Sequence, residues 1–170
     1  MRYFQKRGKS EDDFALLLDN LVWSTSKQDV TEHWDMQGVL RDVTTETYKF
    51  DVKSMKKSSR SDSKPDPDIA WIESRNVRGD PGWVHGRADY IAFEQPHVWV
   101  VVHRLKLLEF MRKKIDSTVE DGASFVSSPE DALYRLYQRK GQRDVISKAK
   151  MSDILAIAMW EVQKFTPQAC

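Results

Sequence analysis

The stretch Thr47-Tyr48-Lys49-Phe50-Asp51-Val52-Lys53 alternates apolar and charged side chains, which is the pattern of a half-buried β-strand. The two aromatic side chains and the valine face one side, while Lys49, Asp51 and Lys53 face the other. Asp51 and Lys53 are then neighbours on the polar face, with Cα atoms about 7 Å apart. This strand organises the interpretation of the whole chain, because it joins a carboxylate to a lysine.

A second strand is predicted just upstream, over His33–Leu40, where polar and apolar residues again alternate. If the two strands pair antiparallel with Asp35 opposite Asp51, the centre of the turn falls at Val43. Val43 lies in the polar run Arg41–Glu46, which is typical of a turn. The sequence therefore predicts a β-hairpin that brings Asp35 and Asp51 together.

Two adjacent carboxylates repel each other when both are ionised, and a shared divalent cation or a shared proton relieves the repulsion. A lysine beside them favours an anionic substrate. This combination fits metal-assisted hydrolysis of a phosphodiester, in which the cation activates water and an ammonium group stabilises negative charge. The alternative is an exposed strand face with alternating charges and no catalytic role.

A helix is predicted upstream of the hairpin, with Ser10 as its N-cap. Its apolar positions follow the i, i+3, i+4, i+7 spacing of an amphipathic helix at Phe14, Leu17, Leu18 and Leu21. Glu11 opens this helix. An acid in the first turn stabilises the helix dipole, so Glu11 serves either the helix or the site.

These parts, in this order, resemble the PD-(D/E)XK nuclease superfamily, and within it the small Holliday-junction-resolvase-like and phage-type endonucleases. Glu11 matches the acid of the first helix, Asp35 the aspartate of the first strand, and Asp51 with Lys53 the (D/E)-x-K pair. The resemblance covers roughly the first 115 residues. Trp34 stands where the family has its name-giving proline, which is a departure.

The resemblance implies an α/β fold: a restriction-endonuclease-like αβββαβ core with a central mixed sheet flanked by helices. It also implies a Mg²⁺- or Mn²⁺-dependent deoxyribonuclease, with DNA, including branched DNA, as the substrate. Asp35 and Asp51 would be metal ligands, Lys53 would position or activate the water, and Glu11 would support them. A junction resolvase acts as a dimer, so a homodimer stays open.

The remaining chain predicts one domain over residues 1–170, with a core at about 10–115 and a C-terminal extension, 117–170, packed on it. A third strand is expected at Ile69–Glu73, the segment Trp83–Glu94 returns to the sheet, and Val98–Val102 reads as a strand buried on both faces.

A helix should follow with inward positions Leu105, Leu108, Met111 and Ile115. A last helix, capped by Ser152, should present Leu155, Ala158, Met159 and Val162 on one face. Residues 117–128 read as a surface connection.

Basic residues near these elements are candidates for phosphate contacts. The polar segment 54–68 leaves the strand just after Lys53 and must be a loop, so its cations can reach a nucleic-acid backbone. Glu73 is a further candidate metal ligand, or a partner of Arg75. The candidate nucleic-acid-binding residues are Lys56, Lys57, Arg60, Arg75, Arg139, Lys140 and Arg143.

Composition limits the function classes. The net charge of +1 gives no global attraction to nucleic acid, so binding depends on local patches. Cys170 is the only cysteine, which excludes an intrachain disulfide and a cysteine-based zinc cluster, and favours a cytoplasmic protein, or one inside a host cell if viral. No apolar run approaches the ~20 residues of a membrane span. An inactive module on the same fold that binds nucleic acid or protein remains the alternative.

Overall fold

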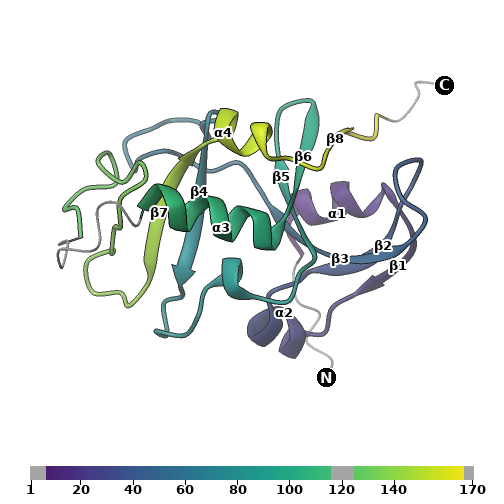
Figure 1. Cartoon of the computed structure of the whole chain (residues 1–170), viewed down its shortest axis with the longest axis horizontal. Coiled ribbons are helices and arrows are strands. Elements are labelled where there is room, and N and C mark those ends of the chain that lie inside the picture. Colours follow the sequence, from purple (N-terminus) through teal and green to yellow (C-terminus); the bar gives the residue numbers. More distant parts are fainter. Residues whose placement is uncertain (1–6, 116–124, 167–170) are drawn as a thin grey trace.

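The structure is a computed structural model that describes residues 7–115 and 125–166. It is a mixed α/β fold with a curled six-stranded mixed sheet, a separate two-stranded sheet and flanking helices (Figure 1). The helices are α1 (Lys9–Ala15), α2 (Ser26–Glu32), the 3₁₀ turn η1 (Trp83–His85), α3 (Arg104–Ile115) and α4 (Met151–Ala156). The strands are β1 (Leu18–Trp23), β2 (Met36–Leu40), β3 (Thr47–Lys53), β4 (Ile69–Arg75), β5 (Tyr90–Glu94), β6 (Val98–His103), β7 (Val145–Lys150) and β8 (Trp160–Gln163).

The predicted hairpin is present. β2 and β3 pair antiparallel with Met36 opposite Phe50, which is the register that the Asp35–Asp51 alignment requires. The turn occupies the expected polar run, where the N–H groups of Val43 and Thr44 both donate to the carbonyl of Leu40. Strand alternation and turn composition were therefore sufficient to place this hairpin.

The large sheet has the order β1-β2-β3-β5-β6-β8, in which β3 and β5 are parallel and the other pairs are antiparallel. β4 forms as predicted but leaves this sheet and pairs antiparallel with β7. Between β3 and β5 the chain thus makes a strand in the second sheet. The expectation of three successive antiparallel strands in one sheet, with Ile69–Glu73 as the third, is wrong. The narrower restriction-endonuclease-like core stays a prediction.

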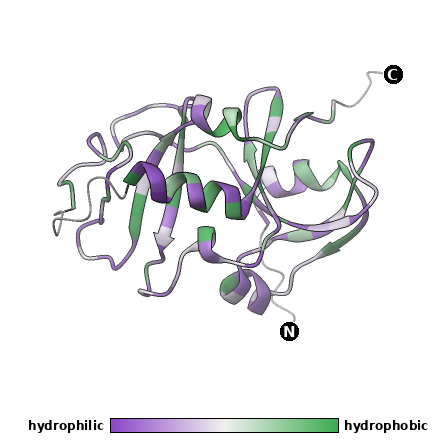
Figure 2. Ribbon diagram, viewed as in Figure 1, coloured by the Kyte–Doolittle hydropathy of each residue, from purple (hydrophilic) through white to green (hydrophobic). Residues whose placement is uncertain are grey.

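Two apolar clusters lie on opposite faces of the large sheet. β6 contributes to both, because Val100 and Val102 face one cluster while Trp99 and Val101 face the other. The prediction that Val98–Val102 is buried on both faces is confirmed for these four residues. β5 and β6 accordingly contain mostly hydrophobic residues (Figure 2). The β4–β7 ribbon packs in the first cluster together with α3, and α1 packs in the second.

The first helix is shorter than predicted. α1 begins after Gly8, which occupies the N-cap position assigned to Ser10, and it ends at Ala15. A backbone hydrogen bond from Leu17 to Phe14 turns the chain, and Leu18 then pairs with Leu40 in β1. Leu17, Leu18 and Leu21 therefore have helical spacing in the sequence, but they lie in a turn and in the edge strand β1, where they are buried or half-buried. α2 was not predicted; Thr25 caps it by accepting from the N–H of Gln28.

The later helices also differ from prediction. In α3 the buried residues are Leu107, Met111 and Ile115, whereas Leu105 is exposed, because the apolar face is rotated from the predicted one. The last helix begins after Lys150 rather than Ser152 and ends at Ala156. Val162 belongs to β8, opposite Trp99, so the four-residue apolar stripe does not lie on one helix. The predicted surface connection at 117–128 lies mostly outside the described residues.

Among the described residues, no helix has both the length and the apolar character needed to cross a membrane.

Candidate active site

The β2–β3 hairpin places Asp35 beside the polar face of β3. The N–H of Asp35 donates to the carbonyl of Phe50 at 2.8 Å, and the Asp35 carboxylate accepts from the N–H of Val52 at 2.6 Å. These two bonds hold the Asp35 side chain against β3. Because side chains alternate on β3, Phe50 and Val52 enter the apolar cluster beneath α1 while Asp51 and Lys53 face the other side of the sheet.

Asp51 and Lys53 form a close ion pair. Their Oδ1 and Nζ atoms are 2.7 Å apart, and the Asp51 side chain is only 4% exposed while that of Lys53 is 26% exposed. The second carboxylate oxygen of Asp51 is buried and accepts no hydrogen bond from an N–H group of the described residues, while the neighbouring Asp35 carboxyl group is close enough to share a proton with Asp51. An unsatisfied buried carboxylate oxygen is costly, so this atom is the natural place for a cation or a proton.

The two aspartates shift each other's protonation. Burial and the nearby Asp51 carboxylate raise the pKa of Asp35 to about 7, against the opposing effect of Lys53. Burial likewise raises the pKa of Asp51, although Lys53 opposes it. Asp35 is therefore partly protonated near neutral pH in the absence of a cation, and its hydrogen bond to Asp51 acts to lower the pKa of Asp51 against the effect of burial.

Lys53 is held charged in spite of its burial. Burial lowers the pKa of its amine, but the carboxylates of Asp51 and Asp35 outweigh that effect and the pKa is raised. Its Nζ lies 4.7 Å from the ring centroid of Trp83, a cation–π contact from η1. The ammonium group is thus positioned by a carboxylate and an aromatic ring together.

Glu11 and Glu73 flank this centre from different elements. Glu11 accepts from the N–H of Gly8 at 3.1 Å, so it caps its own helix, while burial and the Asp35 carboxylate raise its pKa. Glu73, on β4, also has its pKa raised by burial, and Lys53 opposes the shift. Both glutamates and Lys53 line the same pocket. Glu11 therefore caps its own helix and lies close enough to Asp35 for that carboxylate to raise its pKa, while its role in a site stays a prediction.

The pocket lies at the end of β3, between the large sheet and the β4–β7 ribbon, and has a volume of about 790 Å³. Segment 54–60 forms part of its wall and contributes Lys56, Lys57 and Arg60. Segment 54–68 contains no helix or strand, which confirms the predicted loop. Three of the candidate phosphate-binding cations thus lie around the same cavity as Lys53.

The other candidate cations are arranged differently. Arg139 lines the pocket but bonds the fully buried Asp144 at 2.6 Å, so it also has a structural role. Arg75, Lys140 and Arg143 are exposed and do not line the pocket. Arg143 packs near Gly79 instead. The structure brings together only part of the predicted nucleic-acid-binding set.

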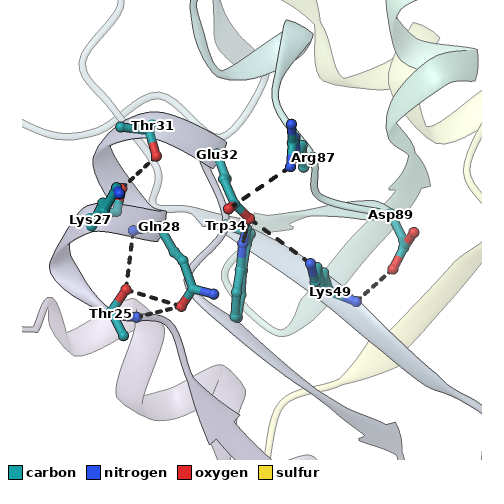
Figure 3. Close-up of polar contacts among 9 residues, drawn as sticks. All are labelled: Thr25, Lys27, Gln28, Thr31, Glu32, Trp34, Lys49, Arg87 and Asp89. Atoms are coloured by element: carbon teal, nitrogen blue, oxygen red, sulfur yellow. Dashed lines mark hydrogen bonds and ion pairs between the residues drawn. The ribbon is translucent and has the colours of Figure 1, made fainter.

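A second polar cluster supports the start of β2 (Figure 3). Glu32, at the end of α2, accepts from the indole N–H of Trp34 at 2.8 Å, and its carboxylate lies 4.0 Å from both Lys49 and Arg87. The backbone N–H of Lys49 donates to Asp89 at 2.7 Å. Trp34 is 3% exposed, so the residue directly before Asp35 is anchored in the core.

The carboxylates around Lys53 meet part of the needs of a divalent cation. In residues 7–115 and 125–166, no three His, Cys, Asp or Glu side chains form a ready-made metal cage. Mg²⁺ commonly uses only one or two carboxylates and completes its shell with water and substrate phosphate. Asp35 and Asp51 supply two neighbouring carboxylates, which fit that smaller requirement. Glu73 interacts with Lys53 and lies on the β4 side of the pocket.

Sequence reasoning missed several residues around the site. Trp83 and Glu94 line the pocket, and Ile146 and Met151 close it from the C-terminal part of the chain. The segment Val145–Lys150 does not alternate cleanly between apolar and polar residues, and nothing local indicated that β7 would pair with β4. In comparisons with known proteins, no family model matches the chain, and no curated protein or solved structure shows significant similarity to it.

Proposed function

We propose that the protein is a Mg²⁺- or Mn²⁺-dependent nuclease that hydrolyses phosphodiester bonds of DNA at the Asp35–Asp51–Lys53 site. The observation that supports it most is the close pair of carboxylates, Asp35 and Asp51, in which Lys53 bonds one Asp51 oxygen and no N–H group of the described residues donates to the other. A structural ion pair has no need of a second buried carboxylate such as Asp35. The basic loop beside the pocket suits a polyanionic substrate.

Each side chain has a distinct role in this proposal. Asp35 and Asp51 would hold the cation, which when bound activates water and takes up charge on the phosphate. Lys53 donates hydrogen bonds to a non-bridging phosphate oxygen or to the attacking water. Water adds to phosphorus, one P–O ester bond breaks, and the leaving oxygen takes up a proton. Glu11 keeps negative charge near Asp35, and Lys56, Lys57 and Arg60 hold the backbone.

The first test replaces Lys53 with alanine and measures cleavage of supercoiled, linear and branched DNA with Mg²⁺ or Mn²⁺. If Lys53 serves the chemistry, the rate should fall by at least about 100-fold while DNA binding is nearly kept. Lys106→Ala, at an exposed position of α3, is the matched control and should cleave normally. Full cleavage by Lys53→Ala would exclude this site.

The Lys53 substitution also removes the partner of a buried carboxylate, which is destabilising in itself. Thermal unfolding must therefore accompany the rate measurement. Asp51→Asn provides the complementary variant, because an amide is a poor ligand for a hard cation and metal affinity should fall together with turnover. Loss of turnover in Asp51→Asn with unchanged Mn²⁺ binding would remove Asp51 from the cation site.

The alternative, an inactive module on the same scaffold, gives a different outcome in the same assay. DNA binding without cleavage under any divalent cation would indicate a nucleic-acid-binding module. Neither binding nor cleavage would indicate a protein-interaction module whose charges are solvated.

A further inference from the structure

Lys148 is a buried cation outside the proposed catalytic centre. It lies on β7 opposite Trp71 of β4 and is 5% exposed. Its Nζ donates to the Ser58 hydroxyl at 3.2 Å and to the Glu130 backbone carbonyl at 3.3 Å, and lies 5.6 Å from the Trp71 ring. Both hydrogen-bond acceptors are neutral. In the described part of the chain, no carboxylate oxygen lies within ion-pair distance of this ammonium group, whereas buried charges are ordinarily paired.

A second pocket, of about 620 Å³, opens beside this lysine. Its wall includes Lys148, Lys64 and the hydroxyl residues Ser58, Ser59 and Ser63. Three acids also line it, but two already bond their own loop: Asp62 accepts from the N–H of Ser59, and Asp66 accepts from the N–H of Asp68. A lysine ammonium group has three N–H donors. Lys148 uses two of its donors on the neutral oxygens of Ser58 and Glu130, which leaves one for a ligand. The three acids keep their negative charge, so an oxyanion would be held at the Lys148 ammonium group and the Ser58 hydroxyl rather than by the pocket as a whole.

Ser58 connects this pocket to the proposed catalytic one, because it lines both. The basic loop that contributes Lys56 and Lys57 runs directly into Ser58, and the Lys57 carbonyl is fixed by the indole N–H of Trp71 at 3.0 Å. The loop that borders the Lys53 pocket therefore also borders the pocket of Lys148.

We propose that Lys148 and Ser58 form a second phosphate subsite, which binds a non-scissile phosphate of the nucleic-acid strand whose scissile bond lies at Lys53. That the bound phosphate belongs to a nucleic-acid strand rests on the proposed nuclease function. That an anion binds here rests on Lys148 and its neutral partners. Lys148 is a binding residue here, and it takes no part in bond cleavage. The shared chemistry is a phosphate oxyanion, which either a phosphodiester or free phosphate supplies.

The test measures binding of a short thymidine oligonucleotide in EDTA, so that cleavage cannot interfere, over a range of salt concentrations. Lys148→Met keeps the length of the side chain and should weaken binding about tenfold, and lower the salt slope by about one, as for one lost phosphate contact. Ser58→Ala should weaken binding to a lesser extent, and Lys148→Arg should restore it. Lys150→Met removes an exposed lysine from the end of the same strand and serves as the matched control.

The structural alternative is that Lys148 only holds the loop in place, without binding phosphate. The variant Trp71→Phe distinguishes this structural role from phosphate binding. This variant removes the indole hydrogen bond to Lys57 but leaves the ammonium group in place. If Lys148 only positions the loop, Trp71→Phe should reproduce the loss of binding, and the salt slope should not change in either variant. That result, or unchanged affinity in a folded Lys148→Met protein, overturns the subsite.

Oligonucleotide binding and DNA cleavage, measured on the same variants, distinguish failure of the subsite from failure of the nuclease function, and inorganic phosphate tests whether a strand is needed. Lys148-dependent oligonucleotide binding in a protein that never cleaves DNA would keep the subsite and remove the nuclease. Binding of inorganic phosphate through Lys148, without any affinity for the oligonucleotide, would overturn the strand-binding proposal. Cleavage that is normal in Lys148→Met at every salt concentration and every DNA concentration would keep the nuclease and remove the subsite.

Discussion

The surroundings of Asp35 change the pKa of its carboxyl group strongly. Its pKa is raised to about 7 by burial first and by Asp51 second. A carboxyl group whose folded pKa is raised binds protons more tightly in the native state. Its contribution to stability is therefore complete below the unfolded pKa and is lost as the pH rises through the folded value.

We accordingly expect the metal-free protein to lose stability between about pH 4 and about pH 8, apart from other titrations. Asp51→Asn removes the neighbouring charge, so the pKa of Asp35 should fall and this pH dependence should shrink. Urea unfolding of both proteins across this range in a chelating buffer is the measurement, with carbon-13 NMR titration of the aspartates as the direct readout. The pair titrates jointly, so both carboxyl signals must be followed. Identical pH profiles for the two proteins would refute the coupling.

At the residue scale, the sequence predicted the local geometry of the site and missed its distant neighbours. The positions of Asp35, Asp51 and Lys53 follow from strand alternation and one turn, which are properties of about twenty consecutive residues. Trp83, which contacts Lys53, comes from a 3₁₀ turn thirty positions later. No periodicity links these two segments, since their contact depends on how β4 and β5 are arranged.

At the scale of the elements, the Glu94 carboxylate links three segments: α1, β5 and the residues after β8. Glu94 accepts from the Ser10 hydroxyl at 2.6 Å and from Lys164 at 2.8 Å. Burial alone would raise the pKa of Glu94, but the hydrogen bonds from Lys164 and Ser10 outweigh it and lower the pKa. A lowered carboxyl pKa adds stability above the unfolded value, and this is lost as the pH falls through the folded value.

Lys164→Met should therefore destabilise the protein at neutral pH by about 1 kcal/mol, the low end for a charged hydrogen bond because the pair remains partly solvated. The difference from wild type should disappear on acidification below the ordinary range of a glutamate. Thermal unfolding at neutral and acidic pH is the measurement. Lys113→Met breaks the exposed Lys113–Glu109 pair on α3 and should leave unfolding unchanged. A deficit in Lys164→Met that persists in acid would show a packing effect instead.

Element types were harder to predict where one pattern suits two structures. Leu17, Leu18 and Leu21 follow a helical spacing, but the chain turns after Phe14 and Ala15 have been buried. The backbone N–H of Arg41 then donates to Leu17, so pairing with the β2 end competes successfully with continuation of the helix. The same ambiguity affected Val162, because four residues of β8 are too few to show a strand period.

At the scale of the whole molecule, one cluster joins the two sheets. Ile72 of β4 and Ala149 of β7 share it with Val100 of β6 and Met111 of α3. We therefore expect the β4–β7 ribbon and the large sheet to unfold together, as the single-domain prediction requires.

Ile72→Ala tests this cooperativity, because Ile72 is 1% exposed and its truncation should cost about 2–5 kcal/mol. Urea unfolding followed by both tryptophan fluorescence and far-UV circular dichroism should remain a single coincident transition, shifted to lower urea. Val77→Ala, at a half-exposed position after β4, should have little effect. Two separated transitions in the variant would mean that the ribbon folds independently.

The pairing of β4 with β7 also bears on synthesis at the ribosome. Asp35, Asp51 and Lys53 are in place once the first hairpin has folded, but β4 acquires its partner strand only when residues 145–150 have left the exit tunnel. Until then one wall of the pocket is missing, including Ile146 and Met151. A nascent chain that lacks residues 145–150 therefore holds Asp35, Asp51 and Lys53 beside a pocket whose β7 wall has not yet formed.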